Sequence, residues 1–219
     1  RRSMRRAEQQ AAERAARARE LGWSYSDAKN GDIVFRFSGS CEGMRWELVY
    51  DSRWSQADSS AQIVWRWREK PARRTELAIL GAMADQIAFG ALSRKVIDLA
   101  GRLGVKGPRQ AGGDDFYQIA QRVQSDLRVF QAEWIVRARK PALFKGIASH
   151  ELADLLTRWP DHSMGRAFTP AAAVNLLYDH EGLKLECSAE VSEMALIEHL
   201  VKIGCTVARR LRAVELDRV

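Results

Sequence analysis

The feature of this sequence that most limits its fold is a change of hydrophobic period at Trp23. Before this residue, a stretch rich in Ala, Arg, Glu and Gln favours a helix from about Ala7 to Leu21, and Gly22 supplies a natural end for it. After it, apolar and polar residues alternate one by one, which is the pattern of half-buried strands. A chain of 219 residues is long enough to bury a sizeable core. The two periods together predict an α+β fold in which a basic helix precedes antiparallel strands.

Three alternating runs follow in close succession, and they predict an antiparallel meander that begins with a hairpin. The small residues from Ser38 to Gly43 separate the first two runs. The apolar positions of the runs are Ile33, Phe35 and Phe37; Met44, Trp46, Leu48 and Tyr50; and Ile63, Trp65 and Trp67. Neighbouring side chains of a strand point to opposite faces, so we expect the tryptophans of the third run to be buried and Arg66 and Arg68 to point away from them.

The middle of the chain contains the best candidate for a domain boundary. Leu77 to Leu80 is a short apolar run that fits a last strand or the first turns of a helix. Apolar residues from Leu92 to Leu103 recur at helical spacing, and the glycine-rich segment 107–113 follows them. We therefore divide the chain into a basic connector helix (1–22), a first α+β half (23–106), a linker (107–113) and a second α+β half (114–219). The halves share an order of elements, which leaves open whether one is a duplicate of the other.

The second half again mixes helices and strands. Asp114 and Asp115 are interpreted as the start of a helix that carries Phe116, Ile119 and Val123, because acids stabilise a helix N-terminus. The further predicted elements are a strand from Ala132 to Ala138, a helix capped by Ser149 with Leu152, Leu155 and Leu156 on one face, a hairpin of Val174–Tyr178 and Leu183–Cys187 around a four-residue turn at 179–182, and a helix from about Val191 to Val214. Gly204 lies on the apolar side of this last helix, where a close approach to another element would use it.

The net charge of +7 is unevenly distributed. Residues 1–22 hold seven arginines and three glutamates, a net of +4, so the other 197 residues carry only +3. This distribution favours a basic terminal arm over a binding groove that runs through the fold. A second basic cluster follows the third alternating run. The residues that we select as possible contacts to a partner or to phosphate are Arg1, Arg2, Arg5, Arg6, Arg66, Arg68, Arg73 and Arg74.

The sequence contains no motif with catalytic spacing. It lacks a phosphate-binding loop, a dinucleotide glycine fingerprint and the signatures of serine hydrolases and zinc proteases. Each of the four histidines lies beside an acid, but sequence neighbours point in different directions and do not make a catalytic pair. Cys41, Cys187 and Cys205 are too few and too scattered for a disulfide framework or a four-thiolate zinc site, which favours a reducing compartment. We therefore expect no catalytic residue, no cofactor and no metal.

Part of the chain resembles a known type of domain. The run from Phe130 to Ala138, the helical positions Leu152, Leu155 and Leu156, and the segments Val174–Tyr178 and Gly182–Leu185 are similar in spacing to a family of uncharacterised bacterial domains that follow transmembrane segments. Gly39 and Trp46 match an earlier part of that pattern. The resemblance implies a membrane-associated bacterial α+β domain and brings no functional residues with it.

These observations favour a binding or assembly module over an enzyme. We expect a non-enzymatic scaffold of a bacterial, membrane-tethered protein, which acts through contacts with a protein partner or a second copy of the chain. Since the first residue is not Met, we expect a longer product whose residues upstream of Arg1 bring the domain near the membrane, on the cytoplasmic side of the bacterial inner membrane, or leave it in the cytoplasm. The alternative is a nucleic-acid-binding protein that uses the N-terminal arginines and those from Arg66 to Arg74, and an enzyme of unknown reaction ranks third.

Overall fold

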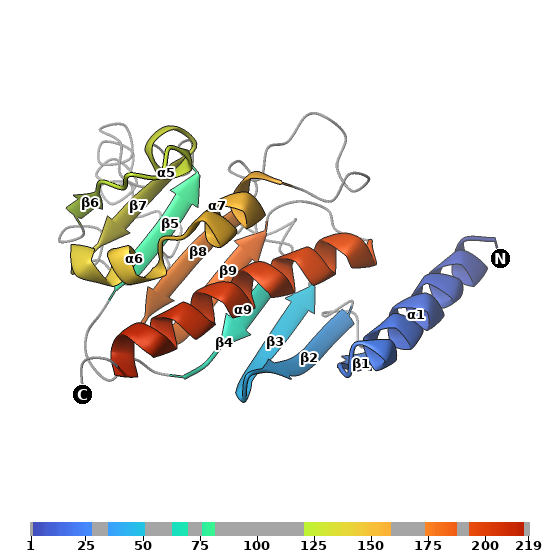
Figure 1. The fold of residues 1–219 in the computed structure, drawn as a ribbon. Coiled ribbons are helices and arrows are strands. Elements are labelled where there is room, and N and C mark those ends of the chain that lie inside the picture. Colours follow the sequence, from blue (N-terminus) through green and yellow to red (C-terminus); the bar gives the residue numbers. More distant parts are fainter. Residues whose placement is uncertain are drawn as a thin grey trace, which may run out of the picture.

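A single antiparallel sheet forms the centre of the protein, and helices cover one of its faces (Figure 1). The computed structural model describes residues 2–27, 35–50, 63–69, 76–81, 121–158, 174–187 and 193–216. The strands are β1 (Ser24–Ser26), β2 (Phe35–Cys41), β3 (Met44–Tyr50), β4 (Ile63–Trp67), β5 (Leu77–Gly81), β6 (Gln121–Val123), β7 (Trp134–Ala138), β8 (Val174–Asp179) and β9 (Gly182–Cys187). Their order across the sheet is β1-β2-β3-β4-β9-β8-β5-β7-β6. The predicted α+β class is confirmed.

The longest described helix, α9, crosses the middle of the sheet. The helices are α1 (Arg2–Glu20), α5 (Val129–Ala132), α6 (Pro141–Ile147), α7 (His150–Thr157) and α9 (Met194–Leu216). Helix α9 packs on β4 and β9, while α6 and α7 pack beside it and α5 and α6 contact β7. Helix α1 lies at the β1 edge of the sheet, apart from the other helices (Figure 1).

The hairpin of β2 and β3 is tighter than the sequence predicts. The strands continue through Cys41 and Met44, which pair directly, so Glu42 and Gly43 alone make the turn. Both turn residues have positive φ, 51° and 79°, which is the geometry of a type I′ turn that matches the twist of the strands. In the second hairpin Asp179 pairs with Gly182, which likewise shortens the predicted four-residue turn to two residues.

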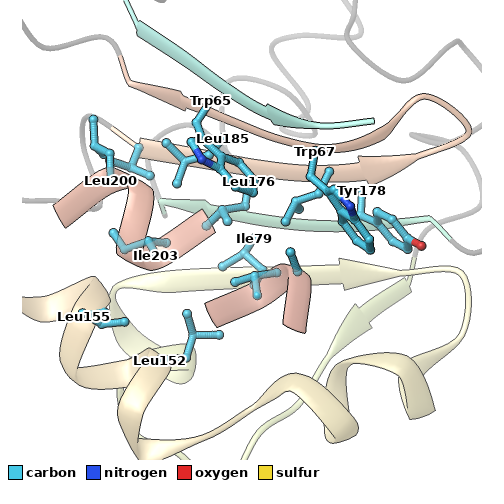
Figure 2. Close-up of a cluster of buried hydrophobic side chains, with 14 of the residues drawn as sticks. Trp65, Trp67, Ile79, Leu152, Leu155, Leu176, Tyr178, Leu185, Leu200 and Ile203 are labelled. Atoms are coloured by element: carbon cyan, nitrogen blue, oxygen red, sulfur yellow. The ribbon is translucent and has the colours of Figure 1, made fainter. Parts of the chain in front are cut away.

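A layer of aromatic and aliphatic side chains fills the space between the sheet and the helices. The six aromatic residues for which the sequence predicts burial are 3% exposed or less: Phe35, Phe37, Trp46, Trp65, Trp67 and Trp134. Figure 2 shows Trp65 and Trp67 in this layer beside Leu185 and Tyr178, with Leu200 and Ile203 of α9 across from the sheet. The strand alternation predicted in this region therefore holds, and it places the tryptophans on the covered face.

Some predicted elements need correction. Val123 belongs to strand β6 and pairs with Val136, so the predicted helix does not extend to it; pairing with β7 overrides the local helical pattern. Ala132 ends the short helix α5 instead of opening the strand, which begins at Trp134. The open question at Leu77 is resolved in favour of a strand, β5.

The two predicted halves share one sheet. Strand β4 pairs with β9, and β5 lies between β8 and β7, so strands from both sides of segment 107–113 alternate in the sheet. The segment itself, the predicted helix from Leu92 to Leu103, and Asp114 and Asp115 lie outside the described residues. The position of a domain boundary therefore stays a prediction.

Candidate functional site

A groove runs between helix α9 and the β2–β3 hairpin, close to the point where α1 leads into β1. Its volume is about 420 Å³, and an adjoining hollow of about 180 Å³ opens toward α7. The groove is lined by Trp23, Ser40, Cys41, Trp46, Ala195, Glu198, His199, Val201, Lys202 and Cys205. Cys41, Lys202 and Cys205 line both spaces, so these residues lie where the groove and the hollow meet.

The floor of the groove is aromatic. Trp23 and Trp46 meet edge to face, with ring centroids 5.0 Å apart and an interplanar angle of 88°. Gly39 lies opposite Trp46 in the hairpin register, and a Cβ on it would come within 2.6 Å of the Trp46 ring. A glycine in β2 therefore lets the indole of Trp46 lie across the neighbouring strand.

An ion pair connects α1 to the wall of the groove. Arg17 Nε donates to Glu198 Oε1 at 2.7 Å, and Arg17 Nη2 donates to Glu198 Oε2 at 3.0 Å. The two parallel bonds fix the orientation of both side chains, as fork-shaped arginine–carboxylate pairs do. This pair holds the C-terminal end of α1 near the start of α9.

His199 is half-buried in the wall of the groove. Its Nε2 lies 2.8 Å from the carbonyl oxygen of Leu155, the geometry of a hydrogen bond that a neutral imidazole can donate. Burial lowers the pKa of His199, the bond to Leu155 opposes this shift, and the nearby charge of Lys202 adds to it. The ring is therefore neutral at physiological pH.

Two cysteines meet where the groove and the hollow join. Cys41 ends β2, Cys205 lies on α9, and both side chains line the groove and the hollow. A hydrogen bond from Cys205 lowers the pKa of Cys41, while the same bond and burial raise the pKa of Cys205. The sequence does not predict this pair, because no local pattern shows that the end of β2 lies against the middle of α9.

Among the selected arginines, the structure places two side chains. Arg66 and Arg68 project from the sheet face opposite the aromatic core, where Arg68 Nη2 lies 3.3 Å from Glu47 Oε2. The same carboxylate binds Arg36, with Arg36 Nη1 3.0 Å from Glu47 Oε1. Arg2, Arg5 and Arg6 fall within α1, but their side chains, and all of Arg1, Arg73 and Arg74, lie outside the described residues. The eight arginines therefore remain predicted contacts.

We call this outer surface of β2, β3, β4 and β9 the polar sheet face. Its charged residues are Arg36, Arg45, Arg66, Arg68 and Lys184, with Glu47 and Glu186 as the acids, so five cations face two anions. Glu47 and Glu186 are engaged by Arg36, Arg68 and Lys184. Within the described part of the chain, no carboxylate pairs with Arg45 or Arg66.

The described residues contain no group of three His, Cys, Asp or Glu side chains placed to hold a metal ion. They also contain no helix that is both long and apolar enough to cross a bilayer. The three described histidines do not converge, because His150 starts α7, His180 lies in the β8–β9 turn and His199 bonds to a backbone carbonyl. His162 lies outside the described residues.

No family model matches the chain, and no curated protein matches it in sequence. Among solved structures, the chain is similar to the crystal structure of the mycobacterial trehalose monomycolate transport factor A, TtfA, with 10% sequence identity and a TM-score of 0.50. The superposition covers 93% of this chain and 94% of the TtfA chain. At this low identity the likeness shows a shared fold, and the fold extends over nearly the whole of both chains.

Proposed function

We propose that the chain is a non-enzymatic assembly module of a bacterial, membrane-associated transport complex, and that it acts by binding another protein. The observation that carries this proposal is the fold shared with a transport factor along almost the whole of both chains. A fold alone does not determine function, so the transfer from TtfA to this chain is our inference.

The charge of the polar sheet face supports a protein partner with an acidic segment. Arg45 and Arg66 lie on neighbouring strands with no acid engaged among the described residues, and Arg36 and Arg68 share one carboxylate. An acidic segment laid across these strands would add the missing anions. Electrostatic complementarity of this kind mainly sets the rate and specificity of association.

The N-terminal helix supports a position close to a membrane. Residues 1–22 carry a net charge of +4, and basic residues near a membrane favour the cytoplasmic side, where anionic lipids attract them. We therefore place the module on the cytoplasmic side of the inner membrane, as the resemblance to domains behind transmembrane segments also implies.

The test compares charge-reversal variants of the tagged, full-length product in its native host. After crosslinking and affinity isolation, the proteins recovered with the wild type are quantified for Arg45→Glu/Arg66→Glu and for a control, Lys145→Glu/Arg158→Glu. The control makes the same change in net charge at two exposed cations on α6 and just after α7. We expect a specific protein to be lost with the first variant and retained with the second, and to sediment with membranes.

Two results would contradict the proposal. Equal recovery of every co-purified protein with both variants would show that the polar sheet face does not bind the partner. Loss of the recovered material on nuclease treatment would favour the nucleic-acid-binding alternative, because the association would then depend on a polynucleotide.

A further inference from the structure

Cys41 and Cys205 line the same groove and hollow from elements that are remote in the sequence. Arg209 Nη1 lies 3.4 Å from Glu42 Oε1, so the residue after Cys41 is held to α9 one helical turn beyond Cys205. Cys41 is the last residue of β2, directly before the Glu42–Gly43 turn, and Cys205 lies in the middle of α9. Both side chains are partly exposed and line the groove and the hollow, so small molecules in solution reach them. Cys187, by contrast, is 0% exposed in the core.

The surroundings make the two thiols unequal. The hydrogen bond from Cys205 stabilises a thiolate on Cys41 and so lowers its pKa, whereas Cys205 keeps its proton. Arg209 of α9 favours the thiolate form of both residues, and Glu42 of the turn opposes it. Lys202 of α9 and Glu151 of α7 complete the charged lining of the hollow. A thiolate that is exposed and beside cations is the reactive form of cysteine.

We propose that Cys41 and Cys205 form a redox-active dithiol that closes to an intramolecular disulfide by exchange with a small-molecule disulfide. The Cys41 thiolate attacks one sulfur of the small disulfide, forms a mixed disulfide and releases one small thiolate. Cys205 then loses its proton to solvent and attacks the sulfur of Cys41, which releases the second small thiolate. The two cysteines are oxidised, the small disulfide is reduced to two thiols, and no other oxidant is needed.

The disulfide would change the groove directly. It would tie the end of the β2–β3 hairpin covalently to α9, so the floor and the wall of the groove could no longer separate at this point. In the reduced protein, noncovalent contacts such as the Arg209–Glu42 ion pair hold the turn against α9. The redox state of the pair thus determines whether this end of the groove can open.

The experiment uses the full chain at low protein concentration in buffers with increasing ratios of oxidised to reduced glutathione. Free thiols are blocked with maleimide, and the disulfides are identified by peptide mapping without reductant. We expect the wild type and the control Cys187→Ala to form the bond between residues 41 and 205 within one chain. We expect Cys205→Ser to accumulate glutathione on Cys41, and Cys41→Ser to react several-fold more slowly at Cys205.

Circular dichroism in reductant shows whether the serine variants keep the wild-type fold, and single-cysteine reactivity is compared only between folded proteins. If the wild type keeps glutathione on Cys41, forms only disulfides between chains, or retains two maleimide-reactive thiols in the most oxidising buffer, the dithiol is refuted. Equal reactivity of Cys41 and Cys205 in the two serine variants would refute the order of attack.

Discussion

At the scale of single residues, Gly204 shows most clearly how one position sets the distance between two elements. A Cβ at Gly204 would lie 2.6 Å from ring atoms of Trp65, which is itself 0% exposed at the centre of the sheet. The glycine therefore lets α9 approach the sheet closely enough to cover Trp65. The sequence predicts a buried glycine in this helix, but it does not reveal which side chain the glycine meets.

We predict that Gly204→Ala destabilises the protein, although alanine is the better helix former. The gain in helix propensity is about 1 kcal/mol, whereas overpacking a dense core costs about 1 to 3 kcal/mol. Urea unfolding of Gly204→Ala and of the wild type measures the difference. A Gly204→Ala protein as stable as the wild type would show that α9 can move away at no cost.

We predict a pH-dependent stability that originates at His199. Burial lowers the pKa of this imidazole in the folded protein, whereas in the unfolded chain the pKa is about 6.5. The stability that His199 contributes is therefore complete when the pH is above the pKa of the unfolded state. It is lost as the pH falls through the lower pKa of the folded state. The free energy of unfolding in urea should decrease from pH 7.5 to pH 5, and less steeply in His199→Gln.

The comparison for this prediction is His180→Gln, which removes a histidine from an exposed turn. If His199→Gln and His180→Gln both follow the wild-type profile, the imidazole of His199 does not contribute to the pH dependence.

At the scale of elements, α1 is attached to the rest of the molecule by its C-terminal end. Ala18 is 1% exposed, the guanidinium of Arg14 lies 4.5 Å from the ring centroid of Phe35, and Arg17 binds Glu198. The sequence predicts a shallow alanine face on this helix, and the structure shows where one of those alanines is buried. An isolated helix of this length is marginal in water, so these contacts are what keeps it ordered.

We predict that Ala18→Asp undocks α1 without unfolding the sheet. A carboxylate at position 18 would have to lose its water in a space that holds only a methyl group, so detaching the helix costs less than burying the charge. Hydrogen exchange should show faster exchange in α1 and unchanged protection in β3, β4 and α9. Ala16→Asp places the same side chain on the exposed side of the same helix and should leave α1 protected. Loss of protection throughout the sheet in Ala18→Asp would instead make α1 part of the core.

The elements that the sequence predicts well are those with one buried face. Strands β2 and β3 alternate clearly because water contacts their outer side, and α9 shows a clear apolar stripe. Strand β5 is buried on both faces and at every position, so its apolar run has no period that would distinguish it from a helix. The three residues of β6 and the four of α5 are too short for any period, and pairing and packing determine them.

The candidate site was less accessible to sequence reasoning. The prediction that the tryptophans and arginines of β4 lie on opposite faces is correct, because a strand requires it. The groove, however, depends on where α9 crosses the sheet and on the register that places Gly39 opposite Trp46. Neither follows from the local pattern, since both are set by contacts between distant segments.

At the scale of the whole molecule, we predict that the chain does not bind a generic single-stranded oligonucleotide with submicromolar affinity. The tryptophans that could stack on bases are buried on the face opposite Arg66 and Arg68, and two of the five cations of the polar sheet face share Glu47. Fluorescence anisotropy at 50 and 200 mM salt tests this. Tight binding that weakens about a hundredfold over this range would indicate about five phosphate contacts and would favour the nucleic-acid alternative.

The order of strands in the sheet also determines when the protein can fold during its synthesis. Strand β4 gains its second neighbour only when β9 has been made, and Trp65 is covered only when α9 follows. Strands β1 to β4 therefore expose an aromatic face until residues 174–216 have been synthesised. Such long-range pairing is slow, and strands with an uncovered apolar face are prone to aggregate. This chain is therefore expected to depend on chaperones that hold the nascent polypeptide.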